Sequence, residues 1–557
     1  MGNFLENLFD QLHRVADRVV LREIRGEQFT SVTGCELLGQ VGRARAFLRE
    51  IGLRPGERCA ILGPNSIQWI VLDLALMAEG VLVVPLYSRQ APSDLAGMMK
   101  DCSPRFFFVS EADLGENVAR IWPEAPPRIT FAEAITKVPS GESLTGPPNP
   151  RANDDLVTII YTSGTSGEPK GVCLNTANLN HIVGCTTGWM DRLDWESSEP
   201  IQVFQYLPFN FAASWIVMLS CISKETVLTL STDLNKLADE IRLSAPNYFF
   251  NVPTLLERVR RGVEEALSKR GAGIPRIYGN AVEAWRRQHE GQRAGRLSLF
   301  LARLFIFNKI RARFGGHLRG LVCGSAPLAP ETQDFFAVLG IPVWQVYGLT
   351  ETCGICTMDD PRSASESGRV GQAIPGIDLM VGENDEIVVR GPNVFPGYWN
   401  RPQETARALQ GGVFHTGDQG EVNSKGNWRI SGRIKNLIIL NSGHNIAPEP
   451  IEEKIAQHVV NVQQVVVVGN GRGYLCALVA GAVEADAVQA ALDYVNMDLP
   501  HYRQVRNFAI FNDAFTPESG LLTANGKLRR DVINARFRDE IEQMYKKQAA
   551  AAGRNAG

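Results

Sequence analysis

The stretch best suited to chemistry is a loop of glycines and hydroxyl residues between two short apolar runs, residues 156–160 and 172–174. Both runs have the length and composition of buried strands. Glycine lets backbone N–H groups turn toward one point, and serine and threonine add donors, so such a loop can form a nest for phosphate oxygens. Lysine adds a positive charge. The candidate phosphate-binding residues are Thr162, Ser163, Gly164, Thr165, Ser166, Gly167 and Lys170.

The spacing of this loop differs from that of the Walker A loop. A Walker A sequence has four residues between its glycines and then Gly-Lys followed by Ser or Thr. Here two residues separate Gly164 from Gly167, and Gly171 follows Lys170. A generic loop of this composition can also be a mobile surface loop, so the phosphate site needs support from the rest of the chain.

Two further strands are expected to end at turns of small residues, and these turns supply a second group of candidates. The strands are predicted at residues 321–323 and 343–347. An α/β sheet commonly binds ligands at the carboxyl ends of such strands. One residue of the second turn is a carboxylate, the ligand type that Mg²⁺ prefers. The turn residues are Gly324, Ser325, Ala326, Pro327, Gly348, Leu349, Thr350 and Glu351.

In this order, the motifs resemble those of the acyl-adenylate-forming superfamily, which includes acyl-CoA synthetases, adenylation domains of nonribosomal peptide synthetases and luciferases. The resemblance covers nearly the whole chain. It implies that residues 324–327 and Tyr347-Gly348 enclose adenine, that Thr350 contacts the α-phosphate, and that Glu351 holds Mg²⁺. It also implies ATP, Mg²⁺ and CoA as the small molecules used.

The resemblance extends to motifs in the last third of the chain. It implies that Asp418, in a Thr-Gly-Asp turn, binds the ribose hydroxyls, and that Arg433 makes a second ribose or phosphate contact. Lys435 occupies the family's hinge position. Gly443 matches a loop that lines the pantetheine tunnel, and Lys527 matches the catalytic lysine.

The resemblance also suggests where the carboxylic acid binds. Many family members have a histidine at the position of Phe211, near the entrance of the acyl pocket. An aromatic ring can gate a pocket by its bulk, although plain core packing explains Phe209 equally well and Phe211 somewhat less well. The candidate substrate-binding residues are Phe209, Phe211, Trp344, Gly348 and Leu349.

The order of the expected elements predicts an α/β fold. A strand at 58–62, a helix at 66–78 and a strand at 81–86 follow the rhythm of a doubly wound α/β layer. We predict a large AMP-binding domain of layered α/β sheets at 1–432, a hinge at 433–435, and a small mobile α+β domain at 436–543. A disordered tail is expected at 544–557.

Composition narrows the class of protein. The chain has 557 residues, of which 44% are hydrophobic and 21% charged, with a net charge of −3. These values are ordinary for a globular protein and give no reason to expect a nucleic-acid partner. We find no secretory signal and no apolar run long enough to span a bilayer, so a cytoplasmic location is expected. The ten cysteines lack a framework spacing and are expected to be reduced thiols.

Residues 269–319 are unusually basic, and leucines and phenylalanines are interleaved with the arginines. This pattern is compatible with peripheral contact to an anionic membrane surface or with binding of acidic CoA. A solvated pair of helices packed on the large domain is the simpler alternative. The character of this insert resembles that of long-chain acyl-CoA synthetases.

Together these observations predict an acid-thiol ligase that forms acyl-AMP from ATP and a medium- or long-chain fatty acid and then transfers the acyl group to CoA. One alternative keeps the fold but loads an aryl, amino or fatty acid onto a carrier protein. The other alternative, of a different class, is a non-catalytic protein that binds acyl groups or nucleotides. The presence of Glu351, Asp418, Arg433 and Lys527 argues against this second alternative.

Overall fold

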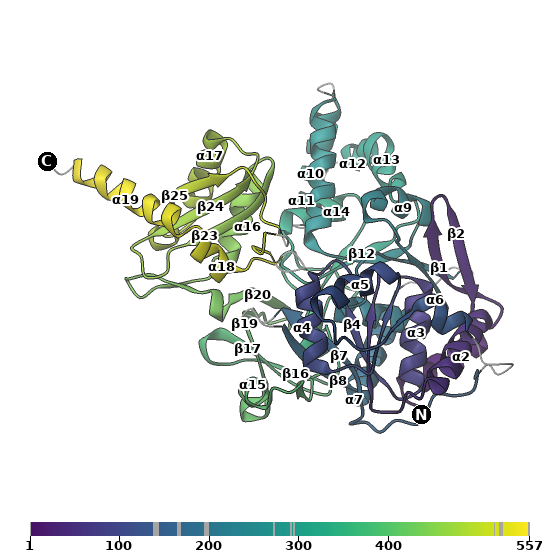
Figure 1. The fold of residues 1–557 in the computed structure, drawn as a ribbon. Coiled ribbons are helices and arrows are strands. Elements are labelled where there is room, and N and C mark those ends of the chain that lie inside the picture. Colours follow the sequence, from purple (N-terminus) through teal and green to yellow (C-terminus); the bar gives the residue numbers. More distant parts are fainter. Residues whose placement is uncertain are drawn as a thin grey trace. The chain divides into compact units, whose positions relative to one another are not determined.

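The computed structural model describes residues 2–137, 144–163, 169–193, 200–270, 273–289, 292, 296–516, 519–522 and 527–554. The chain divides into two compact units, and Figure 1 shows the elements of both. Unit 1 comprises Met1–Met380, Val389–Phe414 and Val422–Arg429, and unit 2 comprises Val381–Val388, His415–Glu421 and Ile430–Gly557. The predicted α/β fold, with a large N-terminal part and a smaller C-terminal part, is confirmed.

The first sheet of unit 1 carries the phosphate-loop strands and has the order β18-β8-β7-β4-β3-β5-β6. Strands β3 to β7 are parallel where they pair with one another, whereas β8 is antiparallel to both β7 and β18. Its strands are β3 (Arg58–Leu62), β4 (Leu82–Leu86), β5 (Phe106–Val109), β6 (Arg128–Thr130), β7 (Leu156–Ser163), β8 (Pro169–Asn175) and β18 (Gly397–Tyr398). The helices in this part of the chain are α2 (Gly34–Glu50), α3 (Ile67–Ala78), α4 (Pro92–Cys102), α5 (Ala112–Ile121), α6 (Phe131–Thr136), α7 (Thr176–Met190) and α15 (Pro402–Ala408).

The second sheet of unit 1 has the order β15-β14-β13-β12-β11-β9-β10-β1-β2. Its strands are β1 (Val19–Arg25), β2 (Gln28–Thr33), β9 (Ile201–Gln205), β10 (Thr226–Leu230), β11 (Tyr248–Asn251), β12 (Gly320–Cys323), β13 (Val343–Tyr347), β14 (Thr357–Met358) and β15 (Gln372–Ala373). The accompanying helices are α1 (Phe4–Arg14), α8 (Ala212–Ile222), α9 (Leu237–Ser244), α10 (Pro253–Ser268), α11 (Gly273–His289), α12 (Arg296–Ala302), the π-helical turn η2 (Arg303–Phe307), α13 (Asn308–Ala312) and α14 (Pro330–Val338).

Helix α3 illustrates how the sequence builds the core of unit 1. The Ser66 side chain accepts a hydrogen bond from the backbone N–H of Trp69 and so caps the first turn. Gly80, just beyond the last turn, has a φ of +79°, a conformation that glycine adopts without steric cost. Every residue of α3 except Gln68 is buried, as expected for a helix that is apolar on all sides.

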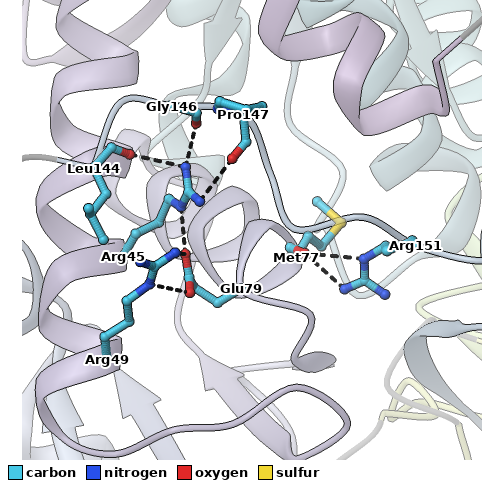
Figure 2. Close-up of polar contacts among 8 residues, drawn as sticks. All are labelled: Arg45, Arg49, Met77, Glu79, Leu144, Gly146, Pro147 and Arg151. Carbon is cyan, nitrogen blue, oxygen red and sulfur yellow. Dashed lines mark hydrogen bonds and ion pairs between the residues drawn. The ribbon is translucent and has the colours of Figure 1, made fainter.

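A buried polar network fixes the segment that leads into β7 (Figure 2). From α2, Arg45 donates to Glu79 at 2.7 Å and to the carbonyl oxygens of Leu144, Gly146 and Pro147 at 2.6–3.1 Å. Arg49 also donates to Glu79, at 2.7 Å. The segment 144–153 is irregular but is held in place by its own backbone carbonyls.

Unit 2 is built around a sheet of order β23-β24-β25, in which β24 is antiparallel to β23 and parallel to β25. Its elements are β21 (Ile438–Ile439), β22 (Asn445–Ile446), α16 (Glu449–His458), β23 (Val462–Val468), β24 (Leu475–Gly481), α17 (Ala485–Met497), β25 (Val505–Phe511), α18 (Arg530–Arg536) and α19 (Arg538–Arg554). The chain passes between the two units at β16 (Asp378–Val381), β17 (Glu386–Arg390), β19 (Phe414–Val422) and β20 (Trp428–Arg433).

The C-terminal segment differs from the predicted disordered tail, because α19 remains helical from residue 538 to residue 554. Met544 is buried in the core of unit 2. The hydroxyl of Tyr545 donates to the carbonyl oxygens of Val468 and Tyr474 at 3.2 and 3.1 Å. These contacts stabilise the middle of a helix whose sequence is otherwise polar and rich in alanine.

Candidate active site

The phosphate-loop residues lie on a β-hairpin formed by β7 and β8. Thr162 is paired with Lys170 across the two strands, and Ser163 is paired with Pro169. The loop connects two strands, as predicted, and the structure shows these strands to be adjacent and antiparallel, with Thr162 and Lys170 side by side at the base of the loop. Gly164, Thr165, Ser166 and Gly167 lie outside the described residues, as does the side chain of Ser163.

Lys170 and Glu351 are brought together by Tyr398, a residue that the sequence did not single out. The Lys170 ammonium lies 5.4 Å from the centre of the Tyr398 ring. The Tyr398 hydroxyl donates to Oε1 of Glu351 at 2.8 Å. Since both contacts lie within unit 1, the phosphate hairpin and the Thr350-Glu351 motif share one neighbourhood.

Tyr398 is held firmly enough to orient the Glu351 carboxylate. Its strand β18 pairs with β8, which places Tyr398 opposite Val172. The ring packs edge-on against Phe395, whose backbone N–H donates to the Glu351 carbonyl at 2.9 Å. Burial, followed by the nearby Glu351 charge, raises the pKa of Tyr398 above the usual value for a phenol. The hydroxyl thus stays protonated and acts as a donor.

The two predicted adenine segments follow adjacent parallel strands. Cys323 of β12 is paired with Gln345 of β13, so Gly324 and Val346 are neighbours at the carboxyl ends. A Cβ atom on Gly324 would lie 2.6 Å from Cγ2 of Val346, which explains the glycine at this position. Ser325 has a φ of +78°, an uncommon conformation for a residue other than glycine. Ala326 and Pro327 complete the turn.

The turn after β13 is equally tight. A Cβ atom on Gly348 would lie 2.5 Å from the carbonyl oxygen of Gly354. The Thr352 hydroxyl accepts from the Leu349 backbone N–H and donates to the Leu349 carbonyl, both at 3.0 Å. Thr350 and Glu351 therefore lie on a constrained 3₁₀ turn and remain partly exposed.

The two phenylalanines predicted to contact the acid have different surroundings. Phe209 is 1% exposed and packs on Trp69 with the ring centres 4.9 Å apart, deep in the core. Phe211 stacks on Phe250 at 6.0 Å with the rings nearly parallel. A Cβ atom on Gly324 would lie 3.5 Å from the Phe250 ring, so the Phe211–Phe250 stack borders the predicted adenine turn.

Trp344 is not brought to the carboxyl edge of the sheet. Its ring contacts Trp189 and Tyr248, with centres 5.5 and 6.1 Å away, and covers Gly320 at the start of β12. It lies in the core of unit 1, whereas Gly348 and Leu349 follow β13 at the opposite end.

The predicted ribose-binding pair is formed within unit 2. Nε of Arg433 lies 2.8 Å from Oδ1 of Asp418, whose side chain is 4% exposed. The turn before Asp418 is fixed by Thr416, which donates to the Ile387 carbonyl and accepts from the Asp418 N–H. Gly417 in this turn has a φ of +69°. The carboxylate is therefore held in a defined position.

Lys435 and Lys527, the predicted hinge and catalytic lysines, belong to the same charged neighbourhood of unit 2. Desolvation, followed by the Arg433 charge, lowers the pKa of Lys435 to about 8, and Lys527 adds to this effect. Asp531 and Asp418 act in the opposite direction. Lys527 is exposed and follows residues 523–526, which lie outside the described residues.

Gly443 lies in a separate turn of unit 2, between β21 and β22. Its φ is +82°, and its N–H donates to the Leu440 carbonyl at 2.9 Å. Nothing lies within 4 Å of the position of a Cβ atom, so the turn is open on that side.

The Glu351 carboxylate is a suitable ligand for a Mg²⁺ ion that binds together with nucleotide phosphates. Magnesium in nucleotide sites is usually held by one or two carboxylates together with phosphate oxygens and waters. Among the described residues no group of three or more metal-ligating side chains occurs. A single, partly exposed carboxylate oriented by Tyr398 satisfies the smaller requirement.

Comparison with known proteins identifies the class. A family model described as AMP-binding enzyme matches residues 8–399, and a second, described as AMP-binding enzyme C-terminal domain, matches residues 435–549. The chain therefore belongs to the AMP-binding enzyme family, the acyl-adenylate-forming superfamily that its motifs resemble.

The sequence identity to individual relatives is low. A protein of Mycobacterium bovis named long-chain-fatty-acid–CoA ligase FadD15 is 28% identical over 98% of this chain and 97% of its own length. A chloroplastic long-chain-fatty-acid–[acyl-carrier-protein] ligase of Arabidopsis thaliana, AEE15, is 26% identical over 96% of this chain and 85% of its own. The structure of O-succinylbenzoate CoA synthetase from Bacillus subtilis with ATP and magnesium has a TM-score of 0.72 at 20% identity, with 94% and 98% of the two chains covered. This last likeness shows a common fold.

Proposed function

We propose that this protein is an ATP-dependent acyl-CoA ligase. It activates a medium- or long-chain fatty acid as acyl-AMP, releases pyrophosphate, and then transfers the acyl group to the thiol of CoA. The observation that carries the proposal is the contact series Lys170–Tyr398–Glu351, because it joins the phosphate hairpin to the motif that would hold magnesium. The names of the fatty-acid–CoA ligases that resemble the chain support the choice of substrate.

A fatty acid is a poor acyl donor because its carboxylate oxygen is a poor leaving group, and transfer to AMP corrects this. The barrier arises mainly from charge, since an anionic carboxylate must approach the anionic α-phosphate. Backbone and hydroxyl donors around Thr162, together with Lys170, would neutralise the phosphate oxygens. Lys527 would do so at the α-phosphate. A single such group is worth about 3 kcal/mol of barrier, by analogy with an oxyanion donor.

Glu351 would hold Mg²⁺, which supplies charge neutralisation on the phosphates when it is bound. Thr350 would contact the α-phosphate. Asp418 would take both ribose hydroxyls as donors, a sensible grip for a carboxylate. The Gly324–Pro327 turn and Tyr347-Gly348 would enclose adenine, and the Phe211–Phe250 stack, which borders this turn, would close one side of the acyl pocket.

The second half-reaction requires a thiol where the catalytic lysine had been. We propose that the small domain, taken as residues 436–543, rotates about a hinge at 433–435 between the steps, a motion absorbed by a few residues. Gly443 would then line the path of the pantetheine arm. The open space around Gly443 supports this role.

The main experiment measures ATP-dependent AMP release with carboxylic acids of graded length, with and without CoA. We expect the rate to rise with chain length and to depend on CoA. Acid-dependent AMP release that needs an acyl carrier protein instead would favour the alternative suggested by AEE15. If no carboxylic acid supports exchange of pyrophosphate into ATP, the protein is a non-catalytic binder and the proposal fails.

The assignment of Lys527 has its own test. Lys527→Ala is expected to lower pyrophosphate exchange by about 10²- to 10³-fold. Thioester formation from supplied acyl-AMP should stay close to that of the unchanged protein. Lys435→Pro should show the reverse pattern, with adenylation retained and thioester formation slowed. Equal loss of both half-reactions in Lys527→Ala would contradict its role.

A further inference from the structure

The helical segment from α12 to α13 presents large apolar side chains to solvent. Leu297 is 70% exposed, Phe300 62%, Leu304 52% and Phe305 46%. The first three are spaced by three and four residues, which places them along one face of a helix. Single exposed apolar residues are common on proteins, whereas a contiguous group of this size usually marks an interaction surface.

The exposed face is not a sign of a poorly packed helix. Ala302, Ile306 and Phe307 of the same segment are at most 3% exposed and belong to the hydrophobic core that also contains Phe249, Leu321 and Val343. Backbone dihedrals at Ala302 and Phe307 are helical, so the helix continues through η2 (Figure 1). The segment is thus anchored to the core by one side while its other side is apolar and uncovered in unit 1.

The charge of this segment is of one sign. Residues 296–319 contain arginine and lysine but neither aspartate nor glutamate. Arg311 is engaged structurally, since it donates to the Gly340 and Leu318 carbonyls at 2.8 and 3.1 Å. Arg303, Lys309 and Arg313 are exposed.

The neighbouring helices lack this feature. Lys269 is paired with Glu265 and Arg287 with Glu283, so the cations of α10 and α11 are partly neutralised on their own helices. In the part of the chain that the structure describes, no carboxylate forms an ion pair with Arg303, Lys309 or Arg313. Uncompensated positive charge is therefore concentrated beside the apolar patch.

We propose that the patch formed by Leu297, Phe300, Leu304 and Phe305, with Arg303, Lys309 and Arg313 around it, docks on the surface of an anionic lipid bilayer. An apolar face bordered by basic residues is the pattern of a helix that lies in the membrane interface. The apolar side chains enter the headgroup region, while the long basic side chains reach the lipid phosphates. CoA would use the charges but not four apolar side chains.

The segment lies on the bilayer and does not cross it. No helix among the described residues is long and apolar enough to span a membrane. The biological purpose of this docking surface rests on the proposed function. Fatty acids partition into bilayers, so an acyl-CoA ligase docked on a bilayer would meet its substrate there. The docking itself is a separate physical claim.

The test is flotation of the full-length protein with vesicles of equal parts phosphatidylglycerol and phosphatidylcholine, and with vesicles of phosphatidylcholine alone. We expect binding to the anionic vesicles and much weaker binding to the neutral ones. Phe300→Ser with Leu304→Ser should lower the bound-to-free ratio about tenfold. Arg303→Glu with Lys309→Glu should do the same.

Two matched controls separate the patch from general surface chemistry. Val460→Ser with Met497→Ser changes exposed apolar residues of unit 2, and Arg14→Glu with Arg120→Glu makes the same change in net charge elsewhere in unit 1. Both controls should bind vesicles as the unchanged protein does. Thermal unfolding of every variant checks that the fold is retained.

Three outcomes would overturn the proposal. The first is absence of binding to anionic vesicles, and the second is equal loss in the control variants. The third is a dimer in vesicle-free solution that Phe300→Ser with Leu304→Ser dissociates, which would make a second copy of the chain the occupant. Pyrophosphate exchange with hexanoate in vesicle-free buffer should be unchanged by these substitutions. If exchange is absent in all proteins while vesicle binding persists, the proposed function fails and the docking surface stands.

Discussion

Unit 1 contains two groups of charged residues that differ in how fully their hydrogen-bonding capacity is used. In the Arg45–Glu79 network, a buried guanidinium faces one carboxylate and three backbone carbonyls. In the Lys170–Tyr398–Glu351 series, the ammonium faces an aromatic ring, and the carboxylate receives one tyrosine hydroxyl. The first group is internally complete, whereas the second keeps charges partly exposed and near one another.

This difference separates a structural role from a functional one. Charges buried in a protein cost free energy unless they are paired and hydrogen-bonded, and the Arg45 network meets that condition. A site that must receive phosphates and a cation instead needs donors and charges that remain available. Substitutions in the first group should therefore change stability, and substitutions in the second should change catalysis.

The largest expected effect is on stability, from Arg45→Met. This substitution removes the Arg45 guanidinium. Glu79 then has one fewer cation, and the carbonyls of Leu144, Gly146 and Pro147 lose their donor. We expect the free energy of unfolding to fall by about 3–5 kcal/mol, measured by denaturant titration. The matched control is Arg49→Met, because the Arg49 side chain is half exposed and should cost less than about 1 kcal/mol. Similar losses in both variants would contradict the distinction.

Asp73 sharpens the comparison because it is a buried acid without such partners. It is fully buried and accepts one hydrogen bond, from the Trp215 indole at 2.8 Å. Burial raises its pKa from 3.8 to about 7. The folded state thus holds a proton that the unfolded state releases, and stability should fall as pH rises from about 4 to about 7.

At 1.36 kcal/mol for each pKa unit, this group alone would contribute a fall of roughly 4 kcal/mol. Asp73→Asn should remove that part of the pH dependence, because the amide keeps the hydrogen bond to Trp215 and cannot ionise. Unfolding midpoints measured from pH 4 to pH 8 provide the test. An unchanged slope in the variant would show that Asp73 is already charged in the fold.

For the second group, Glu351→Gln should lower pyrophosphate exchange by about 10²- to 10³-fold, a loss of about 3 kcal/mol of barrier stabilisation. Its free energy of unfolding should change by no more than about 0.5 kcal/mol, since the side chain is partly exposed. Glu366→Gln is the control, because Glu366 pairs with Lys425 in unit 1 outside the candidate site. A stability loss without a rate loss would reverse the assignment.

The smallest expected effect comes from Tyr398→Phe, which keeps the ring over Lys170 and removes only the hydrogen bond to Glu351. We expect about a tenfold slower exchange, the scale of one hydrogen bond to a charged group. Tyr161→Phe is the matched control, since the hydroxyl of Tyr161 on β7 donates to the Asp101 carboxylate of α4 at 2.6 Å. If both variants lose activity equally, Tyr398 acts through packing and not through Glu351.

The sequence was most informative where structure is local. The hairpin of β7 and β8 and the strand–turn pairs at β12 and β13 follow from short apolar runs that end at glycine-rich turns. The contact between Thr162 and Lys170 is a direct consequence of that hairpin. These elements place most of the predicted nucleotide-binding turns at strand ends.

Contacts between distant parts of the chain could not be predicted in the same way. Tyr398 lies 47 residues from Glu351, on a strand of only two residues. The sequence around Tyr398 does not predict its hydrogen bond to Glu351. The Phe250 ring that stacks on Phe211 comes from another strand. Trp344 was predicted to contact the substrate, but its ring turns into the core. Its position in the sequence, close to a predicted site, does not reveal this. Side-chain direction depends on neighbouring strands that a single sequence does not reveal.

The Arg45 network has a consequence for how this protein can diverge. It recognises the chain before β7 only through main-chain oxygens, which every amino acid possesses. Substitution in that segment should therefore be tolerated far more readily than substitution of Arg45, provided that the carbonyls keep their places. A connection held by its backbone can drift in sequence while the strand that follows it stays in register.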